Sequence, residues 1–194
     1  MRERLIGLLS ARKGHFKLES GHHGELWLDL DSLFLRPGRV GPFAAELARL
    51  LSSHQIEAVC GPLLGGALLA EMIAAELDVE FYYSERSTQP RGNALYAVKY
   101  QIPIALRAKV SGRRVAVVDD VINAGSAVRA TLADLLGCGA RPMAIGALLV
   151  LGSPASTLAV DNGIPLERIA SLPNVVWEPA RCPLCAARTP LEHP

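Results

Sequence analysis

The sequence predicts an α/β fold in which a parallel sheet is flanked by helices. Two apolar runs, Val115–Val118 and Ala144–Leu151, lack the polar alternation of half-exposed strands, so we expect strands buried on both faces. Helical patterns over Leu68–Leu77 and Ser126–Leu136 separate such strands, which is typical of a parallel sheet. The chain has 194 residues, half of them hydrophobic, and this suits a single domain spanning residues 1–194.

The elements before this region follow from the same periodicity. Leu5, Leu8 and Leu9 indicate a short amphipathic helix near the N-terminus. Two short strands are expected around a Gly/His turn, with a helix after them that begins at a Pro-Gly pair. The strands are Phe16–Leu18 and Leu26–Leu30, the turn is Gly21–Gly24, and the helix follows Pro37 and carries Val40, Phe43, Leu47, Leu50 and Leu51 on one face.

The middle of the chain alternates in the way the fold class requires. Strands are predicted at Ala58–Cys60 and Glu80–Ser84. Residues 95–106 are apolar and extended, and Pro103 within them favours an edge strand or hairpin arm. From Pro173 the chain is rich in proline and reads as an irregular tail.

Composition argues against several classes of protein. The net charge of +1 and the 5% content of aromatic residues do not favour a nucleic-acid partner. No apolar run is long enough to cross a bilayer, and the N-terminus does not resemble a signal peptide. We therefore expect a cytoplasmic protein that binds neither nucleic acid nor membranes and acts on small molecules.

The most informative segment is Val115–Ala127. A buried strand leads into the carboxylates Asp119 and Asp120, and a loop of small residues then opens a helix at Ser126. Ligands of open α/β sheets bind at the carboxyl ends of the strands, and free backbone N–H groups at a helix N-terminus favour an anion. The paired acids would repel a phosphate but can accept hydrogen bonds from a diol. This run therefore predicts a ribose 5-phosphate site.

Val115–Ala127 resembles the 5-phosphoribosyl-1-diphosphate motif of type I phosphoribosyltransferases, and within them the orotate phosphoribosyltransferases. The resemblance implies the type I phosphoribosyltransferase fold. It also implies that Asp119 and Asp120 hold the ribose hydroxyls. The 5′-phosphate loop implied by it comprises Val121, Ile122, Asn123, Ala124, Gly125, Ser126 and Ala127.

A second loop, Gly61–Gly66, has glycines that allow close backbone approach to a ligand, although a tight turn without a ligand explains them equally well. The resemblance implies that Leu63, Leu64, Gly65 and Gly66 meet the pyrophosphate. Some members of the family have a lysine where Gly65 stands. Pyrophosphate binding would then depend on the main chain and on Mg²⁺, the expected cofactor, bound through substrate oxygens.

The two ends of the chain are expected to form a small hood. Gly14–Gly21 resembles the N-terminal segment that covers the base in orotate phosphoribosyltransferases, which implies base or hood roles for Phe16, Lys17, Glu19, Ser20 and Gly21. The hood and tail segments are residues 1–36 and 173–194. Without the resemblance, a strand and turn at the domain edge would be the preferred interpretation.

The tail, Trp177–Leu191, resembles the end of one bacterial branch of the same family and contains Cys182 and Cys185. A Cys-x-x-Cys pair supplies only two of the four ligands of a structural zinc site. His193 or a second copy of the chain could complete it, but a pair of reduced thiols in a turn is the preferred interpretation. Cys60 and Cys138 are expected to be buried small hydrophobes.

Three departures from the family pattern concern the lid and the base. The segment Ser84–Asn93 aligns with a lid rich in lysine, yet it offers only Arg86 and Arg91, with Lys99 beyond it. Asn123 stands where a hydroxyl residue is usual. Gly152-Ser153 replaces an Asp-Arg pair whose arginine reads the orotate carboxylate, which leaves Lys17 and Arg86 as candidates for that role.

The expected reaction is transfer of the phosphoribosyl group to a base, most simply orotate, by a homodimer that shares its lids across the interface. The candidate catalytic residues are Asp119, Asp120, Arg86 and Lys99. Three alternatives stay open: the same chemistry on another base, a regulator that binds 5-phosphoribosyl-1-diphosphate without turnover, and an unrelated nucleotide-binding domain. The sequence lacks the Gly-x-Gly-x-x-Gly and Walker motifs that would favour the last of these.

Overall fold

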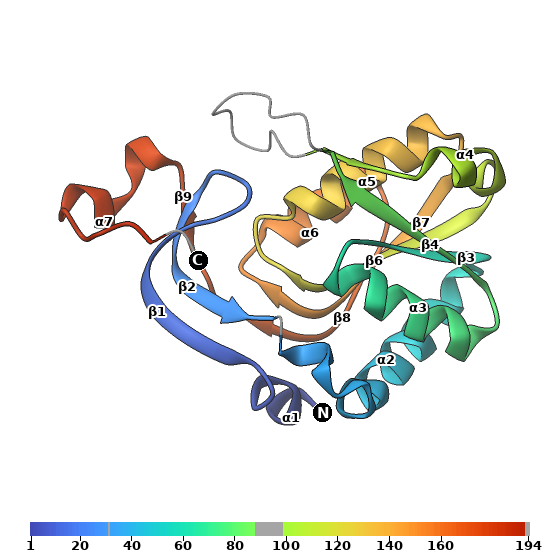
Figure 1. Ribbon diagram of the computed structural model, residues 1–194, viewed down its shortest axis with the longest axis horizontal. Coiled ribbons are helices and arrows are strands. Elements are labelled where there is room, and N and C mark those ends of the chain that lie inside the picture. Colours follow the sequence, from blue (N-terminus) through green and yellow to red (C-terminus); the bar gives the residue numbers. More distant parts are fainter. Residues whose placement is uncertain (31, 88–98, 193–194) are drawn as a thin grey trace.

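A six-stranded sheet forms the centre of the molecule. The computed structural model describes residues 1–30, 32–87 and 99–192. The strand order is β5-β4-β3-β6-β7-β8, and all neighbours are parallel except the short edge strand β5. The strands are β3 (Ala58–Pro62), β4 (Glu80–Arg86), β5 (Tyr100–Gln101), β6 (Arg114–Ile122), β7 (Arg141–Leu151) and β8 (Leu166–Leu172). The predicted α/β class is confirmed (Figure 1).

Helices cover both faces of this sheet, and each face has its own apolar core. On one face, α2 (Pro37–Leu51) and α3 (Gly65–Leu77) pack with Val59, Ala116 and Val118. On the other, α5 (Ser126–Gly137) and α6 (Pro154–Asn162) pack with the intervening residues, including Val115 and Val117. Successive residues of a strand point to opposite faces, so a strand buried on both must be apolar throughout. This explains the unbroken apolar runs.

A separate three-stranded sheet joins the two ends of the chain. It has the order β1-β2-β9, and both pairings are antiparallel. Its strands are β1 (Ser10–Lys17), β2 (His23–Asp29) and β9 (Val176–Trp177). Figure 1 shows this sheet, with the four-residue helix α7 (Pro183–Ala186), standing beside the main sheet. We call β1, β2, β9 and the turn between β1 and β2 the hood.

The remaining elements include several that the sequence did not predict. α1 (Arg2–Ile6) ends before Leu8 and Leu9, and the 3₁₀ turns are η1 (Leu33–Leu35), η2 (Ser52–His54) and η3 (Pro179–Arg181). Of the stretch expected to be extended, residues 95–98 lie outside the described residues. The expectation was wrong from Ile104 onward, because α4 (Ile104–Val110) begins there with Pro103 as its N-cap. The start of a helix tolerates proline well, because the N–H group that proline lacks has no partner there. Pro103 therefore marks the start of a helix and not an edge strand.

Within the described part of the chain, no helix combines the length and apolar character needed to span a membrane.

The packing of α2 against the sheet generates a stability prediction. Leu47 is fully buried in the core that α2 forms with β7. Leu47→Ala should reduce the free energy of unfolding by about 2–5 kcal/mol, because it removes buried methyl groups and leaves a cavity. Urea unfolding followed by circular dichroism measures this. Leu35, which is 78% exposed, is the matched control, and Leu35→Ala should change the free energy by less than about 0.5 kcal/mol. Equal effects of the two substitutions would contradict the packing described here.

Candidate functional site

A cavity of about 350 Å³ opens between the carboxyl end of the central strands and the hood. The central sheet contributes its wall from β6, the start of α5 and the end of β7. The hood contributes the other wall. The lining residues are Leu18, Glu19, Ser20, Leu26, Trp27, Leu28, Asp29, Leu30, Asp119, Val121, Ile122, Asn123, Ala124, Gly125, Ser126, Ala127 and Leu151. The position is the one at which open parallel sheets bind ligands.

The two carboxylates predicted to bind a diol lie side by side in β6. The sequence predicted that they follow the strand. They lie within it instead, because β6 continues to Ile122 and is still paired with β7 there. Asp119 is half-buried and lines the cavity, whereas Asp120 is buried. Asp119 accepts a hydrogen bond from the backbone N–H of Asp120 (3.2 Å), and Asp120 accepts one from Val121 (2.7 Å). These bonds hold both side chains against the main chain.

The glycine loop meets the carboxylates directly. A Cβ atom on Gly65 would overlap the Asp120 carboxylate, and one on Gly66 would lie 2.6 Å from Asp119 Oδ1. Gly61 is packed against the backbone of Gly66 in the same way. Leu63 and Leu64, joined by a cis peptide bond, are both exposed at this turn between β3 and α3. The glycines are therefore required by close packing, and this packing brings two segments distant in sequence into one site.

Charge is concentrated at the acid pair. Burial raises the pKa of Asp119 well above its ordinary value, the neighbouring Asp120 carboxylate raises it further, and Glu19 adds to the effect. The hydrogen bond from the Asp120 N–H acts in the opposite direction. A group that donates hydrogen bonds to Asp119, or a cation beside it, would favour its charged form. The pair is thus suited to a ligand that brings hydroxyl donors or positive charge.

The phosphate loop predicted from the sequence lies beside the acids. Asn123, Ala124 and Gly125 connect β6 to α5, and Gly125 adopts a left-handed conformation (φ 76°) as the N-cap of α5. The first N–H groups of an α-helix have no partner within the helix, and its N-terminus carries partial positive charge. The Asn123 side chain accepts a hydrogen bond from Asn174 (3.0 Å), which fixes the loop to the segment after β8. The loop and helix start can therefore hold an anion.

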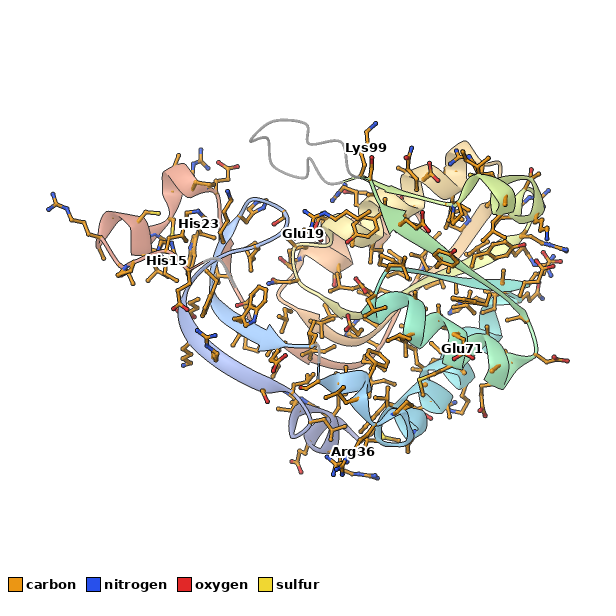
Figure 2. The ribbon with its side chains drawn as sticks, viewed as in Figure 1. His15, Glu19, His23, Arg36, Glu71 and Lys99 are labelled. Atoms are coloured by element: carbon orange, nitrogen blue, oxygen red, sulfur yellow. The ribbon has the colours of Figure 1, made fainter. Side chains whose placement is uncertain are left out.

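Of the hood residues named from the sequence, Glu19 and Ser20 line the cavity, while Phe16, Lys17 and Gly21 do not. Phe16 is buried in the hood against Trp27, with ring centroids 6.0 Å apart. Lys17 is exposed. Glu19 accepts a hydrogen bond from the Tyr100 hydroxyl (3.0 Å) and lies 3.5 Å from Arg86. Its carboxylate therefore connects the hood to the edge of the main sheet (Figure 2).

The sequence reading missed the second hood strand as part of the site. Leu26, Trp27, Leu28, Asp29 and Leu30 all line the cavity, although only a strand was predicted there. A usable signal existed, because Leu26–Leu30 is the predicted strand that directly follows the Gly14–Gly21 segment expected to cover the base. Leu151, at the end of β7, was missed as well.

Of the three cations proposed for the lid, the structure describes Arg86 and Lys99. Arg91 lies outside the described residues. Arg86, at the end of β4, is paired with Glu19, and Lys99 is exposed and borders a different hollow, together with Arg129. Figure 2 shows Lys99 at the rim of the molecule. None of the described residues that line the 350 Å³ cavity is lysine or arginine.

Comparison with known proteins agrees with this geometry. Residues 39–178 match the Phosphoribosyl transferase domain family. The chain is 31% identical to the orotate phosphoribosyltransferase of Thermotoga maritima over 182 residues, which cover 94% of this chain and 90% of that protein. It is 30% identical to that of Caldanaerobacter subterraneus over 94% of this chain and 88% of the relative.

Solved structures share the fold. The orotate phosphoribosyltransferase from Aeropyrum pernix superposes with a TM-score of 0.63 at 25% identity and covers 88% of this chain and 90% of its own. The adenine phosphoribosyltransferase from Trypanosoma brucei, in complex with AMP, pyrophosphate and ribose 5-phosphate, gives a TM-score of 0.68 at 18% identity over 87% and 78% of the two chains. The chain therefore belongs to the phosphoribosyltransferase family, and within it the chain is similar to proteins named orotate phosphoribosyltransferase.

Proposed function

We propose that the protein is an orotate phosphoribosyltransferase, which converts 5-phosphoribosyl-1-diphosphate and orotate to orotidine 5′-phosphate and pyrophosphate. The observation that carries the proposal is the placement of Asp119 and the loop Asn123–Gly125 on the wall of one cavity, at the carboxyl end of β6. A diol acceptor and an anion site on the wall of one cavity suit the two ends of a ribose 5-phosphate. The sequence similarity to enzymes named for orotate supplies the choice of base.

In this proposal each part of the site has one task. Asp119 and Asp120 accept hydrogen bonds from the two ribose hydroxyls, which favours the charged form of Asp119. The backbone of the loop Asn123–Gly125, the N-terminus of α5 and the Ser126 hydroxyl hold the 5′-phosphate. The backbone of Leu63–Gly66 approaches the pyrophosphate, which the absence of a side chain at Gly65 permits.

The chemistry is displacement at the anomeric carbon. A ring nitrogen of the base forms the new bond to C1 as the bond to pyrophosphate breaks, and positive charge develops on the ribose ring. Asp119, which lines the cavity, and Asp120 behind it would stabilise this charge, and the walls of the cavity would hold the base in line with C1. The apolar hood residues Leu26, Trp27 and Leu28 suit the face of a flat base.

Mg²⁺ is the proposed cofactor. Its preference for oxygen ligands fits a site with the carboxylates of Asp119 and Asp120 beside the expected diphosphate. When bound, it would neutralise charge on the leaving pyrophosphate. Substrate oxygens and water would supply most of its ligands.

We extend the proposal to the properties that accompany this activity. The chain would act in pyrimidine nucleotide synthesis in the cytoplasm, as a homodimer of single domains spanning residues 1–194, with residues 1–36 and 173–194 as hood and tail. Arg86 and Lys99 would act from the lid on the pyrophosphate. Arg86 would have to leave Glu19 to do so, and the 3.5 Å separation between two side chains that are 63% and 33% exposed permits that exchange.

A second candidate is the same reaction on a base without a carboxylate. It is favoured by the absence of lysine and arginine among the described lining residues of the cavity, where Glu19, Asp29 and Asp119 are all acidic. A buried carboxylate without a cation is costly. The two candidates differ only in the base.

A pyrophosphate-release assay with 5-phosphoribosyl-1-diphosphate, Mg²⁺ and one base at a time tests the proposal. Orotate, uracil, adenine, hypoxanthine, guanine and xanthine form the panel, with calorimetric titration of the sugar diphosphate beside it. We expect turnover with orotate. Turnover with a different base alone would select the second candidate, while tight binding without any turnover would indicate a regulator and overturn the enzymatic proposal.

Asp119→Asn should separate catalysis from stability. We expect kcat to fall by about 10²–10³-fold, because the stabilising charge is lost. The melting temperature at neutral pH should rise, since the substitution removes a charge whose burial, and whose repulsion by Asp120, raise the pKa of Asp119. A raised native pKa means that the wild type regains this stability as the pH falls below that value, so the difference should vanish in acid.

Asp161→Asn, on the exposed surface of α6, is the matched control and should alter neither activity nor the pH dependence of melting. The account of the acid pair would be wrong if Asp119→Asn melted below the wild type at neutral pH while retaining activity.

A further inference from the structure

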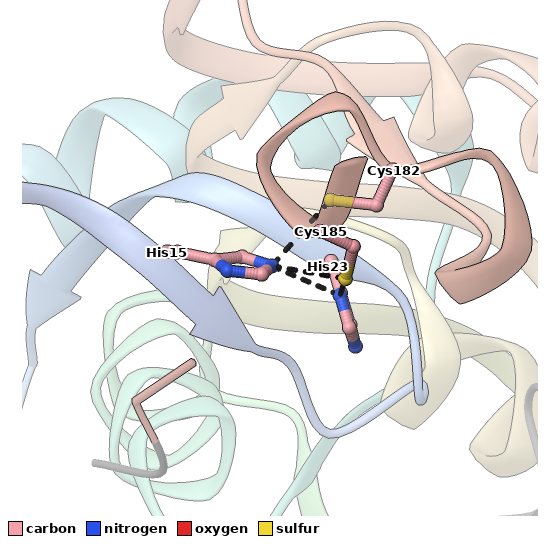
Figure 3. Close-up of side chains that lie close together, drawn as sticks. All are labelled: His15, His23, Cys182 and Cys185. Carbon is pink, nitrogen blue, oxygen red and sulfur yellow. Dashed lines mark hydrogen bonds between the residues drawn. The ribbon is translucent and has the colours of Figure 1, made fainter. Parts of the chain in front are cut away.

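Four potential metal ligands converge at the end of the hood distant from the acid pair. They are His15 in β1, His23 at the start of β2, Cys182 just before α7 and Cys185 within it. Their ligand atoms all lie within 4.8 Å of one another. Figure 3 shows the two imidazole rings and the two thiols turned toward a common point. Segments more than 150 residues apart in sequence thus supply one cluster.

The distances match a tetrahedral site. His15 Nε2 lies 3.0 Å from His23 Nδ1 and 3.4 Å from Cys182 Sγ, and Cys185 Sγ lies 3.3 Å from His23 Nδ1 and 3.7 Å from His15 Nε2. Zinc binds nitrogen at about 2.0–2.1 Å and sulfur at about 2.3 Å, so the edges of its tetrahedron are about 3.3–3.8 Å. Small shifts of the side chains would bring the four ligand atoms to these separations.

The tautomer of His15 supports metal binding. Its Nδ1 lies 2.9 Å from the carbonyl oxygen of Thr189, and a carbonyl can only accept a hydrogen bond. Nδ1 therefore carries the proton, and in the neutral ring Nε2 presents its lone pair to the cluster. A backbone acceptor that fixes the tautomer of a histidine in this way is typical of metal sites.

A bulge in β1 and the pairing of β2 with β9 position these residues. The register of β1 against β2 shifts between Lys13 and Phe16, so β1 has a bulge next to His15. Gly14 fits this bulge because a Cβ atom there would lie 2.8 Å from the Phe16 ring. On the other side, β9 pairs Trp177 with His23, which directs the tail over the hood. Cys182, the N-cap of the short α7, and Cys185 within it then lie one helical turn apart.

We propose that His15, His23, Cys182 and Cys185 bind one structural Zn²⁺ ion. Two thiolates and two imidazoles form a closed set of four ligands, as in structural rather than catalytic zinc sites, and soft sulfur ligands disfavour Mg²⁺ and Ca²⁺. His15, His23 and Cys182 are at least 95% buried and Cys185 is exposed, so three of the four ligands are shielded from solvent. This replaces the preferred reading of the cysteines as a plain thiol pair, and it needs neither a second copy of the chain nor His193, which lies outside the described residues.

The ion would fasten the tail to the hood. Besides the pairing of β9, the described contacts that hold the end of the tail to the hood are few. They include the backbone bonds of Glu192 to His15 and Lys17, the bond of His15 to Thr189, and an exposed ion pair between Arg12 and Glu192. α7 has only four residues and no buried apolar side chain of its own. A zinc ion would supply the stability that so small a unit lacks. Because β2 and the turn between β1 and β2 line the cavity, the ion would also hold the base-facing wall in place.

The test begins with metal analysis of the full-length protein, purified without chelators or a histidine tag, by plasma mass spectrometry. We expect one zinc per chain. Cys182→Ser and Cys185→Ser should each bind much less, whereas Cys138→Ser and His54→Gln, which change the same residue types outside the cluster, should retain it. Cobalt-substituted wild type should show the visible absorption bands of tetrahedral thiolate-bound Co²⁺, and Cys182→Ser should not.

Two further readouts keep the proposal decisive if a variant fails to fold. A chelator should lower the melting temperature of the wild type, and added Zn²⁺ should restore it, both without any need for enzyme activity. The proposal would be overturned by folded wild type that contains no metal and takes up no Zn²⁺ at micromolar concentration. It would equally be overturned by a disulfide between Cys182 and Cys185 in freshly purified protein, seen as the loss of two hydrogens in the intact mass.

Discussion

The contact between the glycine loop and the acid pair is the constraint around which the site is built. Gly65 and Gly66 leave no room for side chains because the carboxylates of Asp120 and Asp119 occupy that space. The contact requires β3 and β6 to be neighbours, and they are parallel partners in the sheet. Strand order, loop composition and the position of the acids therefore depend on one another, and the proposed diphosphate and ribose sites become adjacent as a result.

The hood depends on contacts of a different kind. Its β1–β2 turn reaches the main sheet through Glu19, which accepts a hydrogen bond from Tyr100 and faces Arg86. Its outer end gathers His15, His23 and the two tail cysteines. One end is thus held by polar contacts that a ligand or lid could exchange, whereas the other would be fixed by metal ligation. This division suits a wall that must admit a base and yet keep its shape.

Local patterns predicted the central fold well, and long-range contacts account for what they missed. The apolar run Val115–Val118 identified a strand buried on both faces, but the pairing that extends β6 to Ile122 comes from its neighbour β7. The position of the acid pair beside the loop Asn123–Gly125 could be predicted because strand, acids and small residues are contiguous in the sequence. The histidine partners of Cys182 and Cys185 were not found, since they lie more than 150 residues away and meet the cysteines only through the pairing of β2 with β9.

A crystal structure of the protein with 5-phosphoribosyl-1-diphosphate and Mg²⁺ would test the central claim most directly. The account predicts that the ribose hydroxyls lie within hydrogen-bond distance of Asp119 and Asp120, with the 5′-phosphate at the backbone of Asn123–Gly125 and the first turn of α5. A sugar diphosphate bound elsewhere, or bound in the same cavity with its phosphate against the acids, would contradict it.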